Sequence, residues 1–356
     1  MNVALLGAGE PHFDGHLKTL QVLPEIEAIH IWGDQAEALE AIGADRPAKV
    51  GTVASDLDDL LSREDPFFAI ATTRNNRKPA LFTRLLEADI HLMAEKPIAN
   101  TAQEVASLVD LAESRGLALG TCYQNRYHPV IQEARRLVSQ GLIGPLMSVE
   151  IRMLTTQPGI RDPKKWLFHK EHAGGGILAW LGCHYIDLMR YITGDEIVSV
   201  AAEVATRSGE AIDVEDIAVL SLRFRSGAVG TLHNGYTMAE KGERYGDVPA
   251  YDTYTGINGQ LGRIYWDDVG QPSHMFAETT HEAWADSPRR EFDFTVGVSP
   301  AYAGVHGEAF IRDFIHAAQG KGEVPASGRD ALQVARVIDG AYASSANGRR
   351  VDIEAP

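Results

Sequence analysis

Two side chains that can move protons, Lys96 and His184, occur in sequence settings that favour a chemical role. Lys96 follows the apolar run Ile90–Met93 and directly precedes Pro97. Desolvation lowers the pKa of a lysine, which suits it to proton transfer and to offsetting alkoxide charge. An imidazole titrates near neutrality and suits His184 to act as a general base in alcohol oxidation. The plainer alternatives are a surface lysine and a satisfied core histidine.

The chain also opens with a glycine-rich segment that is typical of a phosphate-binding turn. Gly7-Ala8-Gly9 directly follows the apolar run Val3–Leu6. Such a turn lets the backbone approach a pyrophosphate, which then lies at the positive N-terminus of the next helix. The third glycine of the pattern is due at position 12, where the chain has His12. Either His12 replaces it, or the loop is longer and Gly15 serves; an ordinary glycine turn is the alternative to both.

An acid near the end of the second apolar run is expected to bind the ribose hydroxyls of a dinucleotide. Asp34 has this position, after Ile31-Trp32-Gly33. The stretch from Gly33 to Asp45 contains four acids and no Lys or Arg, so a 2′-phosphate finds no partner there. We therefore predict NAD as the cofactor and expect NADP(H) to bind far more weakly. The alternative is that these acids only solvate a helix face.

The elements that position these residues can be outlined from apolar periodicity. In the first third of the chain, runs apolar on both faces alternate with helical patterns, which predicts a parallel sheet covered on both sides. Thr101–Glu104 has the pattern of a capping box at the start of one of these helices. The runs that we expect to be strands are Val3–Leu6, Ala28–Trp32, Phe67–Ala71, Ile90–Met93 and Leu117–Leu119.

The pattern changes after about residue 122. Partly alternating runs separated by turns predict an antiparallel sheet with one solvated or interface-forming face. These runs are Leu146–Thr155, Val198–Thr206, Asp216–Phe224 and Val229–Tyr236, with helices at Pro129–Gly141, Gly307–Ala318 and Asp330–Ser345. The Gly-, Tyr- and Asp-rich stretch Gly242–Gly262 has no clear assignment. We predict an α/β nucleotide-binding domain at residues 1–122 and an α+β domain for substrate binding and oligomerisation at residues 123–356.

Composition excludes several classes of function. The 356 residues carry 49 acidic and 33 basic side chains, a formal charge of −16, and the basic residues do not cluster. Nucleic acid and anionic membrane surfaces are therefore not expected as partners. The two cysteines offer neither a disulfide framework nor a zinc-type spacing, so we expect no metal. No signal peptide or 18-residue apolar run is seen, and we expect a cytoplasmic location.

Four segments together resemble the Gfo/Idh/MocA family of NAD(P)-dependent sugar and cyclitol oxidoreductases, over nearly the whole chain. They are Thr72-Thr73-Arg74-Asn75, Glu95-Lys96-Pro97, Tyr123-Gln124-Asn125-Arg126-Tyr127, and Gly174-Gly175-Gly176 followed by Gly182-Cys183-His184-Tyr185-Ile186-Asp187. The resemblance implies a Rossmann domain, with a doubly wound parallel sheet, followed by a domain with a large, mainly antiparallel open sheet. It also implies a homodimer or homotetramer formed through that second sheet.

The resemblance assigns roles to individual residues. It places Lys96 and His184 at the reacting substrate hydroxyl as the catalytic pair. It implies a cofactor site formed by Gly7, Gly9, His12, Asp34, Thr72, Thr73, Asn75, Glu95 and Lys96. Arg126, Trp180, Asp187 and His169 are candidates for substrate contact; Asp187 stands three residues after His184, on the same face if the segment is helical.

The sequence departs from the family pattern at two positions. Arg74 stands where proline is usual, and it either reaches phosphate or substrate or is a solvated surface residue. Trp180 stands where family dehydrogenases often carry an aspartate, so that the usual trio is reduced to Lys96 and His184. Either those two suffice, or a nearby group substitutes; the candidates are Asp162, His169 and Glu171. Trp180 itself either stacks on a sugar ring or is a core aromatic.

Three functions follow from these patterns. The leading hypothesis is an NAD-dependent oxidoreductase that transfers hydride between nicotinamide and a carbinol carbon of a sugar, sugar derivative, polyol or cyclitol. The second is a redox-neutral glycosidase or lyase in which transient oxidation acidifies a neighbouring C–H. The third is a non-catalytic NAD-dependent regulator, suggested by the missing aspartate at Trp180 and opposed by the presence of Lys96 and His184.

Overall fold

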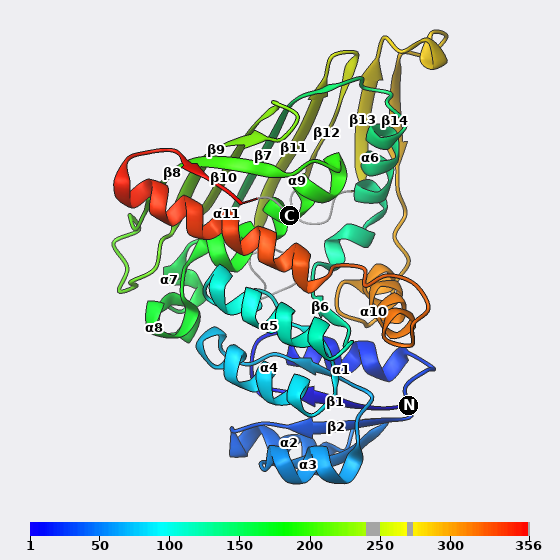
Figure 1. Ribbon diagram of the computed structural model, residues 1–356, viewed down its shortest axis with the longest axis vertical. Helices are drawn as coiled ribbons and strands as arrows, with labels where there is room; N and C mark the ends of the chain where they lie inside the picture. The colour runs from blue at the N-terminus through cyan, green and yellow to red at the C-terminus, as the bar shows by residue number, and fades with distance from the viewer. Residues whose placement is uncertain (240–249, 269–272, 355–356) are drawn as a thin grey trace. The chain divides into compact units, whose positions relative to one another are not determined.

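The computed structural model describes residues 1–239, 250–268 and 273–354 (Figure 1). By their internal contacts these residues form two compact units. The first comprises Met1–Tyr127 and Gly297–Leu332, and the second comprises His128–Val296 and Gln333–Pro356. The functional division predicted at residue 122 assigns roles to the two parts of the chain, and it stays a prediction.

The first unit is built on a six-stranded parallel sheet with the order β3-β2-β1-β4-β5-β6. The central strands are buried on both faces, as their continuous apolar sequences require. β2 and β3 lie on one side of β1, and β4, β5 and β6 follow on its other side. The strands are β1 Asn2–Leu6, β2 Ala28–Trp32, β3 Val50–Ala54, β4 Phe68–Ala71, β5 His91–Ala94 and β6 Leu119–Thr121.

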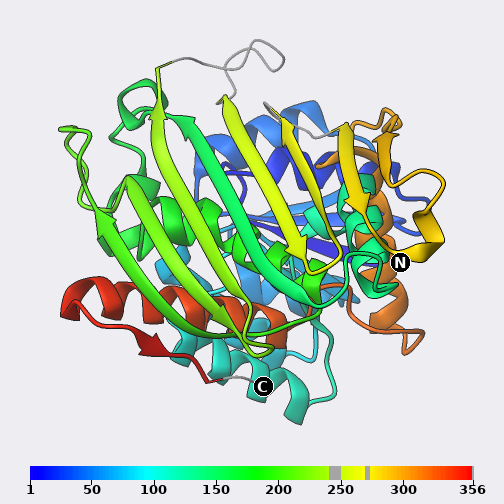
Figure 2. The ribbon, with the colours of Figure 1, turned by 90° about the horizontal axis from the view of Figure 1, so that it is seen from above.

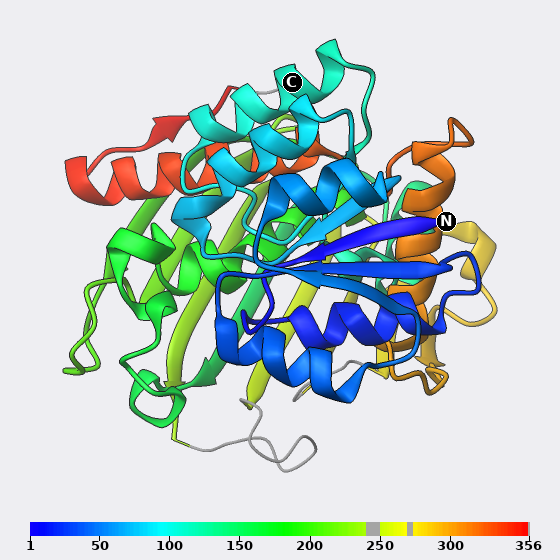
Figure 3. The ribbon, with the colours of Figure 1, turned by 90° about the horizontal axis from the view of Figure 1, so that it is seen from below.

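Helices cover both faces of this sheet (Figure 3). α1 Phe13–Val22 and α2 Ala36–Asp45 lie on one face, and α3 Leu57–Glu64, α4 Lys78–Glu87 and α5 Ala102–Ser114 lie on the other. The predicted capping box of α5 is present, because Thr101 accepts from the Glu104 N–H while the Glu104 carboxylate accepts from the Thr101 N–H. The sheet and its helices confirm the predicted doubly wound architecture.

One strand of this sheet differs from the sequence prediction. β3 was not expected, and the run predicted as the third strand is β4. β3 is an edge strand whose residues are only half-buried and include Gly51, so it lacks a continuous apolar run. The pattern rule for buried parallel strands misses such an edge because only one side of the strand is paired and its faces are partly solvated.

The segment Gly297–Leu332 completes the first unit although it is distant in sequence. Its helix α10 Gly304–Ala318 packs against α1 and against the 3₁₀ turn η2 Gln124–Tyr127. Phe314 of α10 meets Phe68 of β4 edge to face, with ring centroids 5.7 Å apart. Ser327 forms a β-bridge with Gly120 of β6. The sequence pattern indicated the helix but not that it belongs with the glycine-rich part of the chain.

The second unit contains a nine-stranded mixed sheet, mainly antiparallel, with the order β14-β13-β12-β11-β7-β10-β9-β8-β15. The predicted fold class is confirmed, with one parallel pair, β7 and β10, inside an otherwise antiparallel set. Part of Gly242–Gly262 forms β11, and its residues 242–249 lie outside the described part of the chain. The strands are β7 Leu146–Thr156, β8 Ile197–Ala205, β9 Ile217–Phe224, β10 Val229–Met238, β11 Tyr251–Gly259, β12 Gly262–Asp268, β13 His274–Thr279, β14 Arg289–Asp293 and β15 Val351–Asp352.

Helices lie along one face of this sheet, and its other face is turned to the viewer in Figure 2. α6 Pro129–Ser139, α9 Cys183–Thr193 and the second-unit part of α11 Gly328–Asn347 pack there. Ser344 and Ser345 of α11 accept from the N–H groups of Ala202 and Val204 on β8. Within the described residues, no helix is long and apolar enough to cross a membrane.

Candidate functional site

The glycine-rich loop lies where the strand order of the first sheet reverses, between β1 and β4. In open parallel sheets this point forms a crevice that receives ligands. Gly7 and Gly9 have positive φ angles of 100° and 85°, and each has a neighbour that a side chain would meet. A Cβ on Gly7 would lie 2.8 Å from the Thr72 hydroxyl, and one on Gly9 2.7 Å from the Gln35 side-chain oxygen. Side chains are therefore excluded at both positions, and a backbone without side chains fits a loop that binds a pyrophosphate at the start of α1.

The structure gives separate roles to the two candidates for the third glycine. His12 has a left-handed backbone (φ 72°) at the N-cap of α1, a conformation in which glycine is usual. Gly15 lies in the first turn of α1, where a Cβ would come within 3.0 Å of the Tyr302 side chain. The His12 and Tyr302 rings stack with centroids 5.0 Å apart. Tyr302, which the sequence analysis did not single out, therefore sets the close packing at Gly15.

Asp34 lies just beyond the end of β2, beside the glycine-rich loop. Its neighbour Gly33 is so close to Ala8 that a Cβ would come within 2.8 Å of the Ala8 methyl group. The Asp34 carboxylate is ion-paired with Arg77, from the 3₁₀ turn η1 Asn75–Arg77 that follows β4. The stretch around Asp34 contains no basic residue in sequence, but the fold supplies one from 43 residues further along the chain.

The polar segment after β4 is largely buried. Thr72 donates to the Leu6 carbonyl (3.0 Å), so its hydroxyl links β4 to β1 at the crevice. Thr73 and Asn75 are also buried. Arg74, which replaces the family proline, points to the glycine-rich loop, with its Nε 3.5 Å from a carboxylate oxygen of Glu10.

Glu95 is a buried carboxylate held between two histidines. One of its oxygens, Oε1, lies 3.1 Å from His12 Nδ1 and 2.9 Å from His16 Nε2. Burial by itself raises the pKa of Glu95, but the two histidines outweigh this and hold that pKa well below the usual carboxyl range. Burial also lowers the pKa of His12. Near neutral pH the arrangement is therefore an ionised Glu95 that accepts hydrogen bonds from a neutral His12 and from His16.

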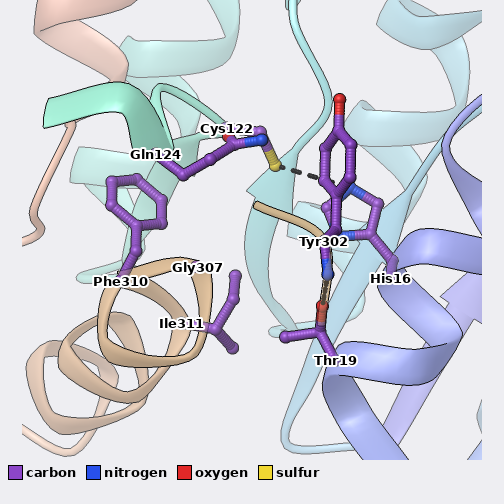
Figure 4. A pocket seen from close by; sticks show the side chains of 8 residues that line it. All are labelled: His16, Thr19, Cys122, Gln124, Tyr302, Gly307, Phe310 and Ile311. Atoms are coloured by element: carbon purple, nitrogen blue, oxygen red, sulfur yellow. Dashed lines mark hydrogen bonds between the residues drawn. The ribbon is translucent and has the colours of Figure 1, made fainter. Parts of the chain in front are cut away.

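A small cavity adjoins this cluster (Figure 4). His16, Cys122 and Tyr302 form one side of it, and Phe310 and Ile311 of α10 form another. The Cys122 sulfur lies 3.9 Å from His16 Nε2. Burial raises the pKa of the Cys122 thiol well above its ordinary value, so the sulfur keeps its proton.

Three side chains of this cluster carry atoms that can ligate a metal ion. His16, Glu95 and Cys122 each present one ligand atom within 4.8 Å of the others. However, a metal needs the thiolate, which burial disfavours here, and Glu95 Oε1 already accepts from two imidazoles. The absence of a metal remains a prediction.

Lys96 follows β5, at the same edge of the sheet as the glycine-rich loop, and is only 2% exposed. A second buried lysine, Lys78, supports this segment. Its Nζ donates to the carbonyl oxygens of Glu95 (2.9 Å), Lys96 (3.3 Å) and Pro97 (2.7 Å). The Lys96–Pro97 peptide is cis. Lys78 was missed from the sequence because it stands at the start of an amphipathic helix, where a lysine is ordinarily solvated.

In the second unit, the three glycines at 174–176 lead into a π-helix, η4 Leu178–Gly182. Two of them are required by close neighbours. A Cβ on Gly175 would overlap the Tyr342 hydroxyl, and one on Gly176 would overlap the Glu215 carbonyl oxygen. The buried Glu215 side chain accepts from the Gly176 N–H (2.7 Å), the Leu178 N–H (3.0 Å) and the Tyr342 hydroxyl (2.9 Å). Burial raises the pKa of Glu215, although these donors oppose the shift.

The clamped π-helix carries Trp180 and runs directly into α9, which carries His184 and Asp187. Single π-helical turns adjoining an α-helix occur frequently at functional sites. Trp180 is 8% exposed and meets Trp166 edge to face at 5.6 Å, as a packed aromatic does. His184 is half-buried and Asp187 is buried. The predicted helical spacing of His184 and Asp187 is therefore present in α9.

The remaining candidates lie in varied settings. Arg126 is buried and ion-paired with Asp330 (3.0 Å), and it also donates to the Pro325 carbonyl (3.0 Å). His169 is half-buried and precedes α8 Lys170–Ala173. Asp162 and Glu171, offered as substitutes for the missing aspartate, are both exposed. The cofactor candidates thus gather in the first unit, whereas His184, Trp180, Asp187 and His169 belong to the second.

The doubly wound sheet, the bare glycine loop at its switch point and the buried lysine at the same sheet edge are features of a dinucleotide-dependent oxidoreductase. Two family models match the chain: an oxidoreductase family model with an NAD-binding Rossmann fold at residues 1–123, and the Gfo/Idh/MocA C-terminal domain at residues 131–265. The chain belongs to the Gfo/Idh/MocA family. The resemblance drawn from the sequence motifs is confirmed, and the protein is an NAD(P)-dependent oxidoreductase of the kind that acts on CH–OH groups.

Relatives with assigned activities match over almost their whole length. Levoglucosan dehydrogenase of Pseudarthrobacter phenanthrenivorans is 26% identical, covering 99% of this chain and 98% of that protein. Inositol 2-dehydrogenase of Rhizobium meliloti is 25% identical, with 98% of each covered. Among solved structures, an oxidoreductase domain protein from Kribbella flavida has a TM-score of 0.83 at 25% identity, covering 99% of each chain. A levoglucosan dehydrogenase complex with NADH and levoglucosan has a TM-score of 0.82 at 24% identity over both whole chains, a likeness in fold.

Proposed function

We propose that this protein is an NAD(H)-dependent dehydrogenase that oxidises a carbinol carbon of a sugar, sugar derivative, polyol or cyclitol, or reduces the corresponding carbonyl. The observation that carries the proposal is the buried Lys96 at the carboxyl edge of the first sheet. It follows β5 there, and the same edge holds the bare glycine loop. An ammonium held at the crevice of a dinucleotide fold is placed to offset the charge that develops on a substrate alkoxide. The relatives that act on levoglucosan and on inositol support this substrate class.

The chain supplies proton handling and positioning. When bound at the glycine-rich loop, NAD⁺ would supply the acceptor for the hydride of the carbinol carbon. In this proposal His184 takes the hydroxyl proton, and the Lys96 ammonium stabilises the developing alkoxide. Lys78 fixes the carbonyls on either side of Lys96 and so keeps its backbone in place. In the second unit, the Glu215 clamp holds the turn that leads to His184.

The cofactor preference rests on Asp34. A carboxylate at the end of the second strand accepts from a ribose 2′-hydroxyl and disfavours a 2′-phosphate. We therefore expect tighter binding of NADH than of NADPH. Relatives of known structure were solved with NAD or NADH, which supports a nicotinamide cofactor without deciding this preference.

The function can be tested by supplying NAD with a panel of sugars, cyclitols and aryl glycosides and following NADH absorbance and phenol release together. Accumulation of NADH with one or more polyols supports the dehydrogenase. Release of phenol without NADH indicates the redox-neutral glycosidase. Binding of NAD with no turnover of any compound indicates the regulator, which the tryptophan at position 180 favours.

Replacement of Lys96 tests the proposed chemistry directly. We expect Lys96→Ala to lower kcat about 10²–10³-fold, the usual cost of removing one group that stabilises developing negative charge. The dissociation constant of NADH, measured by fluorescence, should change far less. Lys18→Ala, an exposed lysine on α1, is the matched control and should keep full turnover. Full turnover by Lys96→Ala would overturn the mechanism.

We also propose that the protein forms a homodimer or homotetramer through the outer face of the nine-stranded sheet. That sheet exposes large apolar side chains, with Met147, Val219 and Val229 at 55%, 46% and 53% exposure. Light scattering at micromolar concentration should give a multiple of 38.8 kDa. Val219→Lys should lower that mass, because a charge at an exposed apolar position of this sheet opposes self-association. A monomeric mass for the unmodified protein would contradict the proposal.

A further inference from the structure

The ion pair between Asp34 and Arg77 places a cation where the sequence indicated none. Asp34 stands at the position that reads the ribose 2′ group in dinucleotide folds. Its carboxylate pairs with the guanidinium of Arg77, which comes from η1 after β4. Because β2 and β4 flank β1 on opposite sides, their following loops meet across the glycine-rich loop.

A second arginine from the same segment, Arg74, lies near the glycine-rich loop. Arg74 is 3.5 Å from the Glu10 carboxylate, and Gln35 donates to the same Glu10 oxygen at 3.4 Å. Gln35 in turn abuts Gly9. The segment after β4 therefore supplies two arginines near the predicted adenosine-ribose site, each paired with an acid.

The Asp34–Arg77 pair can rearrange at low cost. The two side chains are 43% and 54% exposed. Exposed ion pairs contribute little to stability, typically about 0–1 kcal/mol, so a ligand can readily replace either partner. A guanidinium binds a phosphate with two parallel N–H donors, whereas a carboxylate accepts from a hydroxyl. The pair therefore offers a carboxylate for a ribose 2′-hydroxyl and a guanidinium for a ribose 2′-phosphate.

We propose that Asp34 and Arg77 together form the site that reads the ribose 2′ position, with Asp34 binding the 2′-hydroxyl of NAD(H) and Arg77 binding the 2′-phosphate of NADP(H). The inference rests on the proposed function, in which a dinucleotide binds at the glycine-rich loop. The enzyme then prefers NADH but retains measurable NADPH binding, and Arg77 sets the size of that preference. Asp34 alone, without its partner, would exclude NADPH more strongly.

The test is direct titration of NADH and NADPH by fluorescence for the unmodified protein and its variants, which requires no substrate. Arg77→Ala should weaken NADPH about 10-fold or more and change NADH less than about 3-fold, as expected for one lost charge-assisted contact. Asp34→Ser should weaken NADH and tighten NADPH, so that the preference reverses. Arg84→Ala, which removes a similar exposed pair with Asp58 on α3, is the matched control and should change neither.

The outcomes separate this inference from the proposed function. If the unmodified protein binds NADH, but Arg77→Ala leaves the NADPH dissociation constant within about 2-fold, the role of Arg77 is refuted while the dehydrogenase proposal stands. If the unmodified protein binds neither nucleotide, the proposed cofactor is wrong and this inference falls with it. Added salt should weaken NADPH more than NADH, and this difference should disappear in Arg77→Ala.

Discussion

At the scale of single residues, Lys78 and Lys96 show that two buried lysines around the loop after β5 can serve different purposes. Both are 2% exposed. Lys78 directs its ammonium at three consecutive backbone carbonyls, which marks it as a residue that positions the segment. Burial of a cation without such acceptors costs several kcal/mol, so these bonds are what allow Lys78 to be buried.

Replacing Lys78 by methionine should preserve the volume of the side chain but leave the three carbonyls without their charged donor. We expect the free energy of unfolding to fall by about 3–5 kcal/mol, the range for breaking a buried charged contact. kcat should fall as well, because the backbone of Lys96 loses its anchor. Urea denaturation and steady-state kinetics measure the two effects. Lys18→Met is the control, and equal stability of both variants would contradict the positioning role.

At the scale of elements, the turn from residue 174 to the π-helix is fixed by what surrounds it. Glu215 satisfies two backbone N–H groups that a π-helix start leaves open. Tyr342 of α11 completes the clamp from the other side. The glycines are consequences of this crowding, since side chains at Gly175 and Gly176 would overlap Tyr342 and Glu215.

Gly176→Ala should therefore be strongly destabilising. We expect a loss of about 2–4 kcal/mol, because the new methyl group meets backbone rather than a movable side-chain end. Gly43→Ala in α2 is the matched control, since nothing lies within 4 Å of its Cβ position. That variant should be neutral or slightly stabilising, by up to about 1 kcal/mol. Thermal denaturation compares the two, and a tolerated alanine at position 176 would show that the turn can relax.

The sequence predicted those elements whose burial or capping depends on residues that are close in the sequence. The central strands of the first sheet and the capping box of α5 are confirmed because burial on both faces and local capping leave direct patterns. The edge strand β3 and the parallel pairing of β7 with β10 were not predicted. Alternation reports that a strand has one buried face but not which strand lies beside it.

The same limit applies to the candidate site. The glycine loop and Lys96 were found because their motifs are local in sequence. Arg77 reaches Asp34 from 43 residues away, and Tyr302 packs on Gly15 from the far end of the chain. The charge argument for NAD counted only the residues near Asp34 in sequence, so it could not include a cation supplied by another strand's loop.

At the scale of the whole molecule, several histidines are held neutral by burial. Burial lowers the pKa of His12, His30 and His91, and it lowers the pKa of His306 to about 4. A histidine whose pKa is lower in the folded state than its ordinary value of 6.5 binds a proton more readily when unfolded. Its contribution to stability is complete above pH 6.5 and is lost as the pH falls toward the folded pKa.

We therefore expect the melting temperature to fall steadily between pH 6.5 and pH 4. His306 alone accounts for about 3 kcal/mol at the acid end of this range. The ionised Glu95 adds a further loss at lower pH, whereas the raised pKa of Glu215 acts in the opposite direction. Differential scanning calorimetry at a series of pH values measures the slope, and His306→Gln should make it shallower. A melting temperature independent of pH over this interval would contradict the prediction.

The first unit is assembled from two stretches of chain, and this has a consequence for the order in which the protein is made. When Tyr127 has been synthesised, the unit still lacks Gly297–Leu332, which includes Tyr302 and α10. At about 5–20 residues per second, translation supplies that segment roughly 10–40 s later. Until then His16 and Cys122 lack the cavity wall formed by Phe310 and Ile311. The N-terminal segment thus meets its last packing partner only after most of the second unit has been synthesised.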